Sequence, residues 1–291
     1  MRVLTLYIRL MRPHQYAKNF FIFLPLFFGG KFLHPGLLVI TMAAWAAFSL
    51  VTSSIYVFND VIDRNYDKKH EKKKNRPIAS GAVSIPHAAT FMCILGLAGL
   101  SLTYLIEPML FFLALAYILM NIAYTLKLKH IAIVDIFLIG FGFLIRLFIG
   151  GVVSGIPLSM WIILMTFLLS LFLALAKRRD DVLIFLQSGV KMREVIDGYN
   201  VRFLDTAMAV MASILIVSYI MYTVSEEVIE SARSENLYLT VIFVIMGVMR
   251  YFQLTYVEKR TDSPTMVLLT DRFIQGTILG WIIAFGIILY L

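Results

Sequence analysis

Four side chains with oxygen donors lie close together in the stretch NDVIDRNYD. Asp60, Asp63 and Asp67 occupy positions i, i+3 and i+7, and Asn59 directly precedes them. On a helix the three carboxylates would lie within an arc of about 60°. Clustered carboxylates repel one another unless a cation joins them, and Mg²⁺ is usually held by one or two carboxylates together with phosphate oxygens. We therefore expect these four residues to bind Mg²⁺ and the three aspartates to act in catalysis.

Basic residues follow the acidic stretch at once, with seven Lys and Arg between Arg64 and Arg76. Acids and bases mixed at the mouth of a membrane-embedded site suit a magnesium-bound diphosphate. A helix end that emerges into water also carries charges of both signs. That alternative suits most of the lysines of the stretch, namely Lys68, Lys69, Lys72 and Lys74.

The rest of the chain must position these groups in a membrane. Only 15% of the 291 residues are charged, against about a quarter in a soluble domain. A spanning helix needs about 20 mostly apolar residues, and open strands cannot persist in lipid. We therefore predict an all-α protein with nine transmembrane helices around a central cavity. The nine candidates are approximately residues 19–33, 37–58, 87–105, 109–126, 131–152, 158–176, 206–224, 237–256 and 273–291.

The basic residues indicate an orientation for these spans. If alternate loops are assigned to one side, beginning with the N-terminus, that side receives 22 of the 26 Lys and Arg. The positive-inside rule then places the N-terminus in the cytoplasm. We expect one domain over residues 1–291, with enlarged cytoplasmic loops at about 59–86 and 177–205. The first candidate span is short and is interrupted by Pro25 and by Gly29 and Gly30.

The N-terminal residues and the single cysteine exclude other classes. No continuous apolar region or small-residue cleavage site opens the chain, so we expect no signal peptide. Leu4, Tyr7, Ile8 and Met11 would share one helical face among basic residues, as in a helix that lies on a membrane surface. Cys93 alone cannot form an intramolecular disulfide. Because the net charge of +8 lies beside membrane spans, it indicates lipid headgroups or phosphorylated substrates and not nucleic acid.

Asp135, Arg146 and Arg250 lie inside predicted spans, where ionisable groups usually face a cavity or a partner. Asp135 near the cytoplasmic end of its span is expected to line the reaction chamber. Arg146, eleven residues later, could pair with an acid on another helix, hold a substrate phosphate, or serve helix packing. Arg250 is similar. A transporter that used these three charges along its path is an alternative, although it leaves the aspartate cluster unexplained.

The motif N-D-x-x-D-x-x-x-D at the cytoplasmic end of the second span resembles the first aspartate-rich motif of the UbiA superfamily of intramembrane prenyltransferases. Other parts of the chain resemble its decaprenyl-phosphate phosphoribosyltransferase branch. The matching residues are His70, Lys73, Arg76-Pro77-Ile78-Ala79 and Gly81, then Arg12-Pro13, Gln15, Lys18-Asn19, Tyr124, Leu128-Lys129, Gly142-Phe143, Arg146, Ala176-Lys177-Arg178, Tyr199, Phe203-Leu204 and Asp271-Arg272.

That resemblance implies a donor, an acceptor and a metal. The branch transfers 5-phosphoribose from 5-phosphoribosyl 1-diphosphate to a polyprenyl phosphate, which gives a lipid-linked pentose precursor for cell-envelope glycans. Mg²⁺ on the aspartates would neutralise the departing diphosphate and stabilise an oxocarbenium-like transition state. The alternative within the superfamily is a prenyltransferase that joins a prenyl diphosphate to an aromatic or other small acceptor.

The resemblance also implies the substrate-binding residues. Many members carry a second D-x-x-x-D motif after the sixth span, where this chain has Lys177-Arg178-Arg179-Asp180-Asp181. Two phosphorylated substrates need positive charge there, so Lys177 and Arg178 are expected to bind phosphate. His70 could donate to a phosphate or be solvated only. The full set of expected substrate ligands is Lys18, Asn59, His70, Lys73, Arg76, Tyr124, Lys129, Asp135, Arg146, Lys177 and Arg178.

Overall fold

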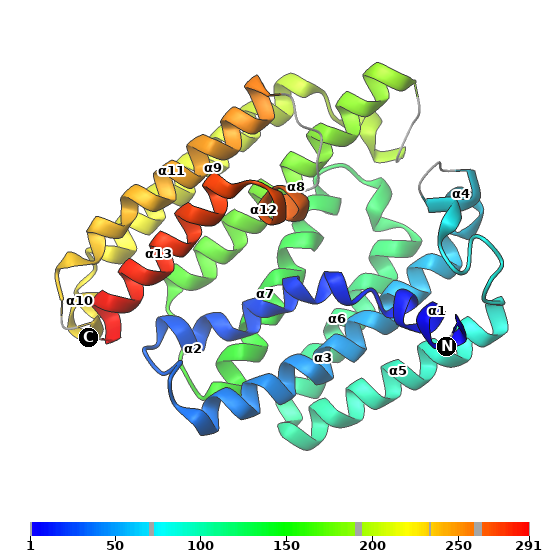
Figure 1. Cartoon of the computed structure of the whole chain (residues 1–291), viewed down its shortest axis with the longest axis horizontal. Helices are drawn as coiled ribbons and strands as arrows, with labels where there is room; N and C mark the ends of the chain where they lie inside the picture. The colour runs from blue at the N-terminus through cyan, green and yellow to red at the C-terminus, as the bar shows by residue number, and fades with distance from the viewer. Residues whose placement is uncertain (1, 70–72, 190–193, 233, 259–263, 291) are drawn as a thin grey trace. The chain divides into compact units, whose positions relative to one another are not determined.

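The computed structural model describes residues 2–69, 73–189, 194–232, 234–258 and 264–290. Within these ranges every regular element is a helix, so the all-α prediction is confirmed (Figure 1). Eight described segments are long and apolar enough to cross a membrane. They are α3 (Pro35–Ile62), α5 (Ile85–Ile106), α6 (Pro108–Leu126), α7 (Val134–Ser154), α8 (Met160–Ser188), α9 (Val201–Thr223), the run from η5 (Asn236–Thr240) through α11 (Val241–Phe252) to η6 (Gln253–Val257), and α13 (Arg272–Tyr290).

The first predicted span has a different local structure. Its residues form the end of a 3₁₀ helix, η1 (Pro13–Phe23), and the five-residue helix α2 (Leu24–Phe28). Pro25 has no N–H to donate, and Gly30 has a φ of 66°, so a long α-helix cannot run through this segment. The count of nine spans is therefore not confirmed by the described helices.

The chain divides into two compact units. The first consists of Met1–Leu128 and Gly142–Leu158, and the second of Lys129–Phe141 and Ser159–Leu291. Helix α7 therefore contributes residues to both units. Shorter elements complete the chain: α1 (Arg2–Met11), α4 (Arg64–Lys69), η2 (Lys73–Asn75), η3 (Leu128–His130), η4 (Glu194–Gly198), α10 (Glu226–Ala232) and α12 (Pro264–Thr270).

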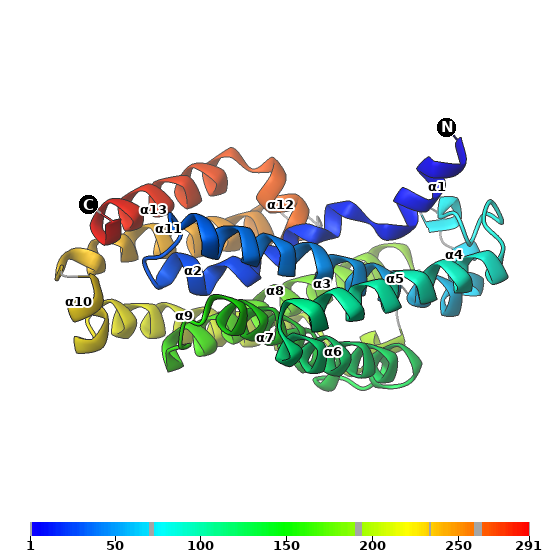
Figure 2. The ribbon, with the colours of Figure 1, turned by 90° about the horizontal axis from the view of Figure 1, so that it is seen from below.

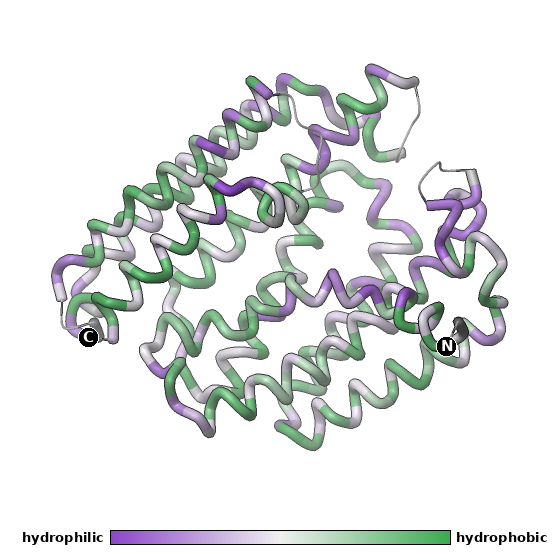
Figure 3. The backbone as a smooth tube through the Cα atoms, in the orientation of Figure 1, coloured by the Kyte–Doolittle hydropathy of each residue, from purple (hydrophilic) through white to green (hydrophobic). Residues whose placement is uncertain are grey.

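In the first unit, α3 packs along α5, and η1 and α6 also lie against α3 (Figures 1 and 2). One core cluster gathers around Phe48 and Leu110, and a second one around Leu10 of α1 and Ile78. Leu10 is fully buried and Tyr7 and Met11 pack beside it, whereas Leu4 and Ile8 of the predicted apolar face are exposed. Figure 3 shows that the polar residues of this unit concentrate at α4 and the adjoining turns.

In the second unit, α8 packs along α9, and α11 packs along α13. Its core includes Phe172, Leu204 and Tyr251. Helix α8 extends through residues 177–188, which were predicted to lie in a loop, and ends at Ser188. Gly189 caps it with a φ of 68°, and its N–H donates to the carbonyl of Phe185 at 2.8 Å, as glycine commonly does beyond a helix end. Lys177 and Arg178 therefore lie on a helix.

Candidate active site

Two buried carboxylates converge near the end of α3 in the first unit. Asp60 is 2% exposed and Asp67 is 3% exposed. Arg76 Nη1 contacts Asp60 Oδ1 at 3.0 Å and Asp67 Oδ2 at 2.6 Å. Because one nitrogen bridges both side chains, the two acids lie together although seven positions separate them.

Arg12 supplies a second cation. Its Nη2 forms an ion pair with the same Asp60 oxygen, and its guanidinium lies 5.4 Å from the centre of the Tyr56 ring. Arg12 directly follows α1 and has a φ of 54°. The backbone of Arg12 is thus held in a left-handed conformation that residues other than glycine seldom adopt. Two arginines therefore neutralise the two buried acids.

The remaining members of the predicted metal set lie on the same stretch of backbone. Asp63 is half-buried and follows the last residue of α3. Its N–H donates to the carbonyl of Asn59 at 2.8 Å, and its own carbonyl accepts from the N–H of Asp67 at 2.8 Å. Helical hydrogen bonding thus continues past the end of α3. The hydroxyl of Thr125 on α6 donates to the side-chain oxygen of Asn59.

The donor set of this cluster fits a hard divalent cation. Within the described ranges, no group of three or more His, Cys, Asp and Glu side chains is arranged to hold a metal by protein ligands alone. Mg²⁺, however, usually takes one or two carboxylates and completes its shell with waters and substrate phosphates. Asp60 and Asp67 would supply two carboxylates of that kind, and Asn59 and Asp63 would add oxygens from the same stretch of backbone.

A buried arginine lies elsewhere in the first unit. Arg146 is 3% exposed, and its Nε donates to Asn19 Oδ1 at 2.8 Å, its Nη1 to the carbonyl of Gly142 at 2.6 Å, and its Nη2 to the hydroxyl of Tyr117 at 3.2 Å. Its guanidinium also lies 5.4 Å from the centre of the Phe48 ring. Among the described residues no carboxylate forms an ion pair with Arg146. The predicted pairing with an acid on another helix is therefore not found there.

Three further predicted ligands of the first unit are half-buried. Lys18 lies on η1, Lys73 on η2 and Tyr124 on α6. His70 lies outside the described residues. The expectation that these residues bind substrate stays a prediction.

The second unit has its own buried ion pair. Arg178 on α8 is 1% exposed and Asp135 on α7 is fully buried. Arg178 Nε donates to Asp135 Oδ2 at 2.5 Å, and its Nη1 donates to Asp181 Oδ2 at 3.0 Å. Tyr199 donates its hydroxyl to Asp135 Oδ1 at 2.6 Å. Arg178 thus lies among protein carboxylates, whereas Lys177, which precedes it, is half-buried.

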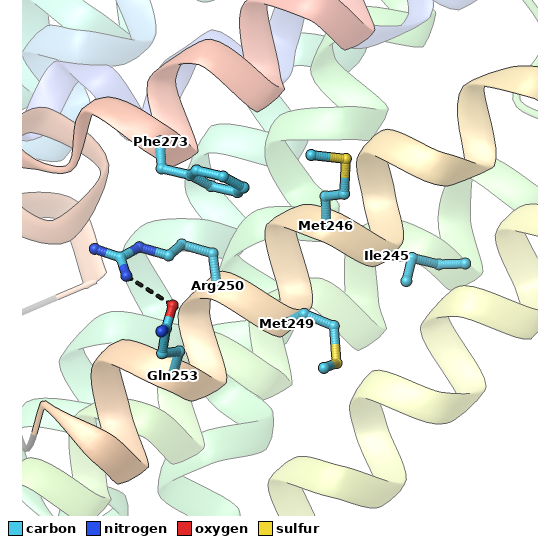
Figure 4. A pocket seen from close by; sticks show the side chains of 6 residues that line it. All are labelled: Ile245, Met246, Met249, Arg250, Gln253 and Phe273. Carbon is cyan, nitrogen blue, oxygen red and sulfur yellow. Dashed lines mark hydrogen bonds between the residues drawn. The ribbon is translucent and has the colours of Figure 1, made fainter.

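The third charged residue of a predicted span, Arg250, is also paired. Its Nη2 contacts Asp271 Oδ2 at 2.7 Å, and its Nη1 contacts Glu258 Oε1 at 2.8 Å. Its Nη1 also donates to Gln253 Oε1 at 2.7 Å, as the dashed line in Figure 4 shows. A pocket of about 430 Å³ adjoins this cluster and is lined by Ile245, Met246, Met249, Arg250, Gln253 and Phe273. Among the described residues, none of the predicted metal or substrate ligands lines that pocket.

Known proteins resemble this chain in sequence and in fold. The sequence model of the UbiA prenyltransferase family matches residues 20–277. The chain belongs to the UbiA prenyltransferase family. It is therefore a membrane-embedded enzyme with several membrane-spanning helices.

Relatives of this UbiA-family chain match it over almost its whole length. A protein named decaprenyl-phosphate phosphoribosyltransferase from Mycolicibacterium smegmatis is 30% identical, over 97% of this chain and 92% of the relative. A protein of the same name from Corynebacterium glutamicum is 27% identical, over 98% and 86%. The solved structure of a UbiA homolog from Archaeoglobus fulgidus bound to GPP and Mg²⁺ has a TM-score of 0.70 at 17% identity, over 98% of this chain and 99% of that chain. That likeness shows the fold.

Two residues of this UbiA-family protein were not predicted as site residues. Arg12 reaches Asp60 from a position 48 residues earlier in the sequence, and Tyr199 reaches Asp135 from 64 residues later. Neither contact has a signal in local spacing. The available clue was their presence among the residues that resemble the phosphoribosyltransferase branch. That resemblance marks a position as shared with the branch but does not say what its side chain contacts.

Proposed function

We propose that this protein transfers 5-phosphoribose from 5-phosphoribosyl 1-diphosphate to a polyprenyl phosphate. A phosphate oxygen of the acceptor forms a bond to C1 of the ribose. The bond between C1 and the diphosphate oxygen breaks, and diphosphate leaves with the electron pair. The observation that carries the proposal is the pair of buried carboxylates, Asp60 and Asp67, in a chain whose near full-length relatives bear the name decaprenyl-phosphate phosphoribosyltransferase.

The acidic cluster would receive the diphosphate of the donor. Asp60, Asp63 and Asp67, with Asn59 beside them, would hold Mg²⁺, which when bound supplies positive charge to the leaving diphosphate. Arg12 and Arg76 already lie against these acids. They would be able to turn toward phosphate oxygens when the metal takes over the carboxylates, because Arg binds phosphate and carboxylate with the same fork of N–H groups.

The acceptor needs no protein base in this proposal. A phosphate monoester is already an anionic nucleophile at neutral pH, so its oxygen can attack without losing a proton to a side chain. The basic residues would instead hold the two anionic substrates in place. We assign this role to the predicted ligands Lys18, His70, Lys73, Arg76, Lys129, Arg146, Lys177 and Arg178, with Tyr124 and Asp135 beside them.

The surroundings follow from the same proposal. The product would be a lipid-linked pentose precursor for cell-envelope glycans, made at the cytoplasmic face of a bacterial inner membrane, and membrane lipid would surround the spans. Nucleic acid has no part in it. A prenyl diphosphate with a small acceptor is the second candidate, because a solved structure of the same fold is described as bound to GPP and Mg²⁺.

The test uses membranes that contain the protein, labelled 5-phosphoribosyl 1-diphosphate, polyprenyl phosphate of several lengths, and Mg²⁺. We expect label to enter the organic phase and to depend on Mg²⁺. Asp63→Asn and Asp67→Asn should each lower the rate by about 10²-fold or more, because metal-assisted charge stabilisation of the leaving group is lost.

Glu107→Gln is the matched control, since it also removes one carboxylate but lies in the connection between α5 and α6. It should transfer label like the unchanged protein. If folded protein transfers no label with any acceptor length but does transfer a prenyl group to an aromatic acceptor, the second candidate replaces the first.

A further inference from the structure

The turn before α7 contains an unusual backbone conformation. Ile133 has a φ of 72° and, with Arg12, is one of two non-glycine residues at positive φ in the described part of the chain. Isoleucine is branched at Cβ, so this region is costly for it. A conformation of this kind persists only where the surrounding structure enforces it.

Tyr199 is the side chain that holds this turn. Its hydroxyl accepts the backbone N–H of Ile133 at 2.6 Å and donates to Asp135 Oδ1 at 2.6 Å. Burial, and then the hydrogen bond to Asp135, raise the pKa of Tyr199 above its ordinary value. The other oxygen of Asp135 accepts from Arg178. One hydroxyl therefore connects the strained residue to a buried ion pair.

Two backbone features restrict the turn further. A Cβ atom at Gly198 would lie 2.5 Å from the Cβ of Ala132, so the segment before Tyr199 approaches the turn as closely as glycine allows. The carbonyl of Ile133 accepts the N–H groups of Ile136 and Phe137, both at 3.1 Å. The conformation of Ile133 therefore sets the direction in which η3 meets α7.

Lys129 lies on η3, just before this turn. We propose that Tyr199 is a positioning residue for the transfer reaction, which holds Ile133 in its left-handed conformation and so directs Lys129 toward the phosphate groups of a substrate. This inference rests on the proposed function for the identity of that substrate. It assigns no contact between Tyr199 and the substrate.

The test compares Tyr199→Phe with Ile133→Gly and with the double variant. Loss of the hydroxyl leaves the N–H of Ile133 and a carboxylate oxygen of Asp135 without their partner, so Tyr199→Phe should raise KM for the donor about tenfold with a smaller change in kcat. Glycine adopts positive φ at no steric cost. Ile133→Gly should therefore restore the KM of Tyr199→Phe to within about threefold of the unchanged protein.

Ile131→Gly is the matched control, because it adds a glycine to the same turn at a residue without positive φ. It should not restore the KM of Tyr199→Phe. A Tyr199→Phe protein that loses thermal stability but keeps its KM would show a structural role only and would overturn the proposal. So would equal rescue by Ile131→Gly and Ile133→Gly.

A second measurement does not depend on the proposed substrate. The rate at which an amine-specific reagent labels Lys129, followed by mass spectrometry, should change several-fold in Tyr199→Phe and return in the double variant with Ile133→Gly. If the protein transfers no phosphoribose, the proposed function fails and this labelling rate decides the inference. An unchanged rate in Tyr199→Phe overturns it.

Discussion

Asp60 and Asp67 are buried acids whose charges are balanced by Arg12 and Arg76. Removal of one partner of a buried ion pair costs about 3–5 kcal/mol, since the other charge stays buried without compensation. Arg76 is the more informative partner because one of its nitrogens contacts both carboxylates. A divalent cation could replace it as the counter-ion.

This balance gives a prediction for Arg76→Gln that does not depend on activity. Without divalent cations the variant should be about 3 kcal/mol less stable than the unchanged protein, since two buried carboxylates lose a cation. With Mg²⁺ the difference should shrink, because a ligand that binds the folded state stabilises it. The measurement is the unfolding temperature in detergent, in EDTA and over a series of Mg²⁺ concentrations.

Lys74→Gln is the control, since Lys74 is an exposed base two residues away on η2. It removes the same charge and should change the unfolding temperature little in either condition. A loss of stability in Arg76→Gln that is equal with and without Mg²⁺ would contradict the idea that metal and arginine balance the same carboxylates.

Residue spacing was enough to predict that Asp60 and Asp67 lie together, but not that Arg12 joins them. Asp60 and Asp67 lie seven positions apart on one stretch of mostly helical backbone, and a single nitrogen of Arg76 contacts both side chains. Arg12 and Tyr199 reach their partners through the packing of distant segments. Local patterns carry no information on such contacts, so the ion pair between Arg178 and Asp135 could not be predicted either.

At the scale of elements, the apolar runs predicted the length and position of the helices. In lipid, an α-helix pairs all the backbone hydrogen-bonding groups of such a run within the segment itself. Eight of the nine predicted segments became long helices. Residues 19–33 did not, because Pro25 and Gly30 interrupt an α-helix there, and this segment also makes a close contact with α7. A Cβ at Gly150 on α7 would lie 2.1 Å from the carbonyl oxygen of Ile22, so η1 lies directly against the backbone of a helix within its own unit.

That contact predicts the effect of Gly150→Ala. A methyl group cannot fit beside the Ile22 carbonyl, and a backbone atom cannot move away as a flexible side chain could. Overpacking of this kind costs about 1–3 kcal/mol, which corresponds to a fall of about 5 °C in unfolding temperature for a chain of this size. Thermal unfolding of the purified protein in detergent measures it.

Gly276→Ala on α13 makes the same substitution where a Cβ would meet no atom within 4 Å. It should leave the unfolding temperature unchanged or raise it slightly, since alanine favours a helix more than glycine does. Equal unfolding temperatures for Gly150→Ala and Gly276→Ala would mean that η1 can shift away from α7 without loss.

At the scale of the whole molecule, composition predicted a membrane protein, and the distribution of basic residues predicted its orientation in the membrane. The low content of charged residues led to a membrane protein, and the family match agrees with it. The distribution of charge alone cannot give the number of spans. Whether one short segment crosses the membrane decides on which side the residues before it lie. Residues 19–33 are that segment, and their 3₁₀ and α-helical turns are not a continuous long helix.

The two ends of the chain test this point. We expect residues 19–33 to cross the membrane, because 22 of the 26 Lys and Arg then fall on one side and the translocation of basic loops is disfavoured. Nine crossings place the N-terminus in the cytoplasm and the C-terminus outside, whereas eight place both on the same side.

Epitope tags at each end, probed in intact and permeabilised spheroplasts, distinguish the two. A C-terminal tag accessible from outside and an N-terminal tag accessible only after permeabilisation would support nine crossings. Two tags on the same side would mean that η1 and α2 enter the membrane without crossing it.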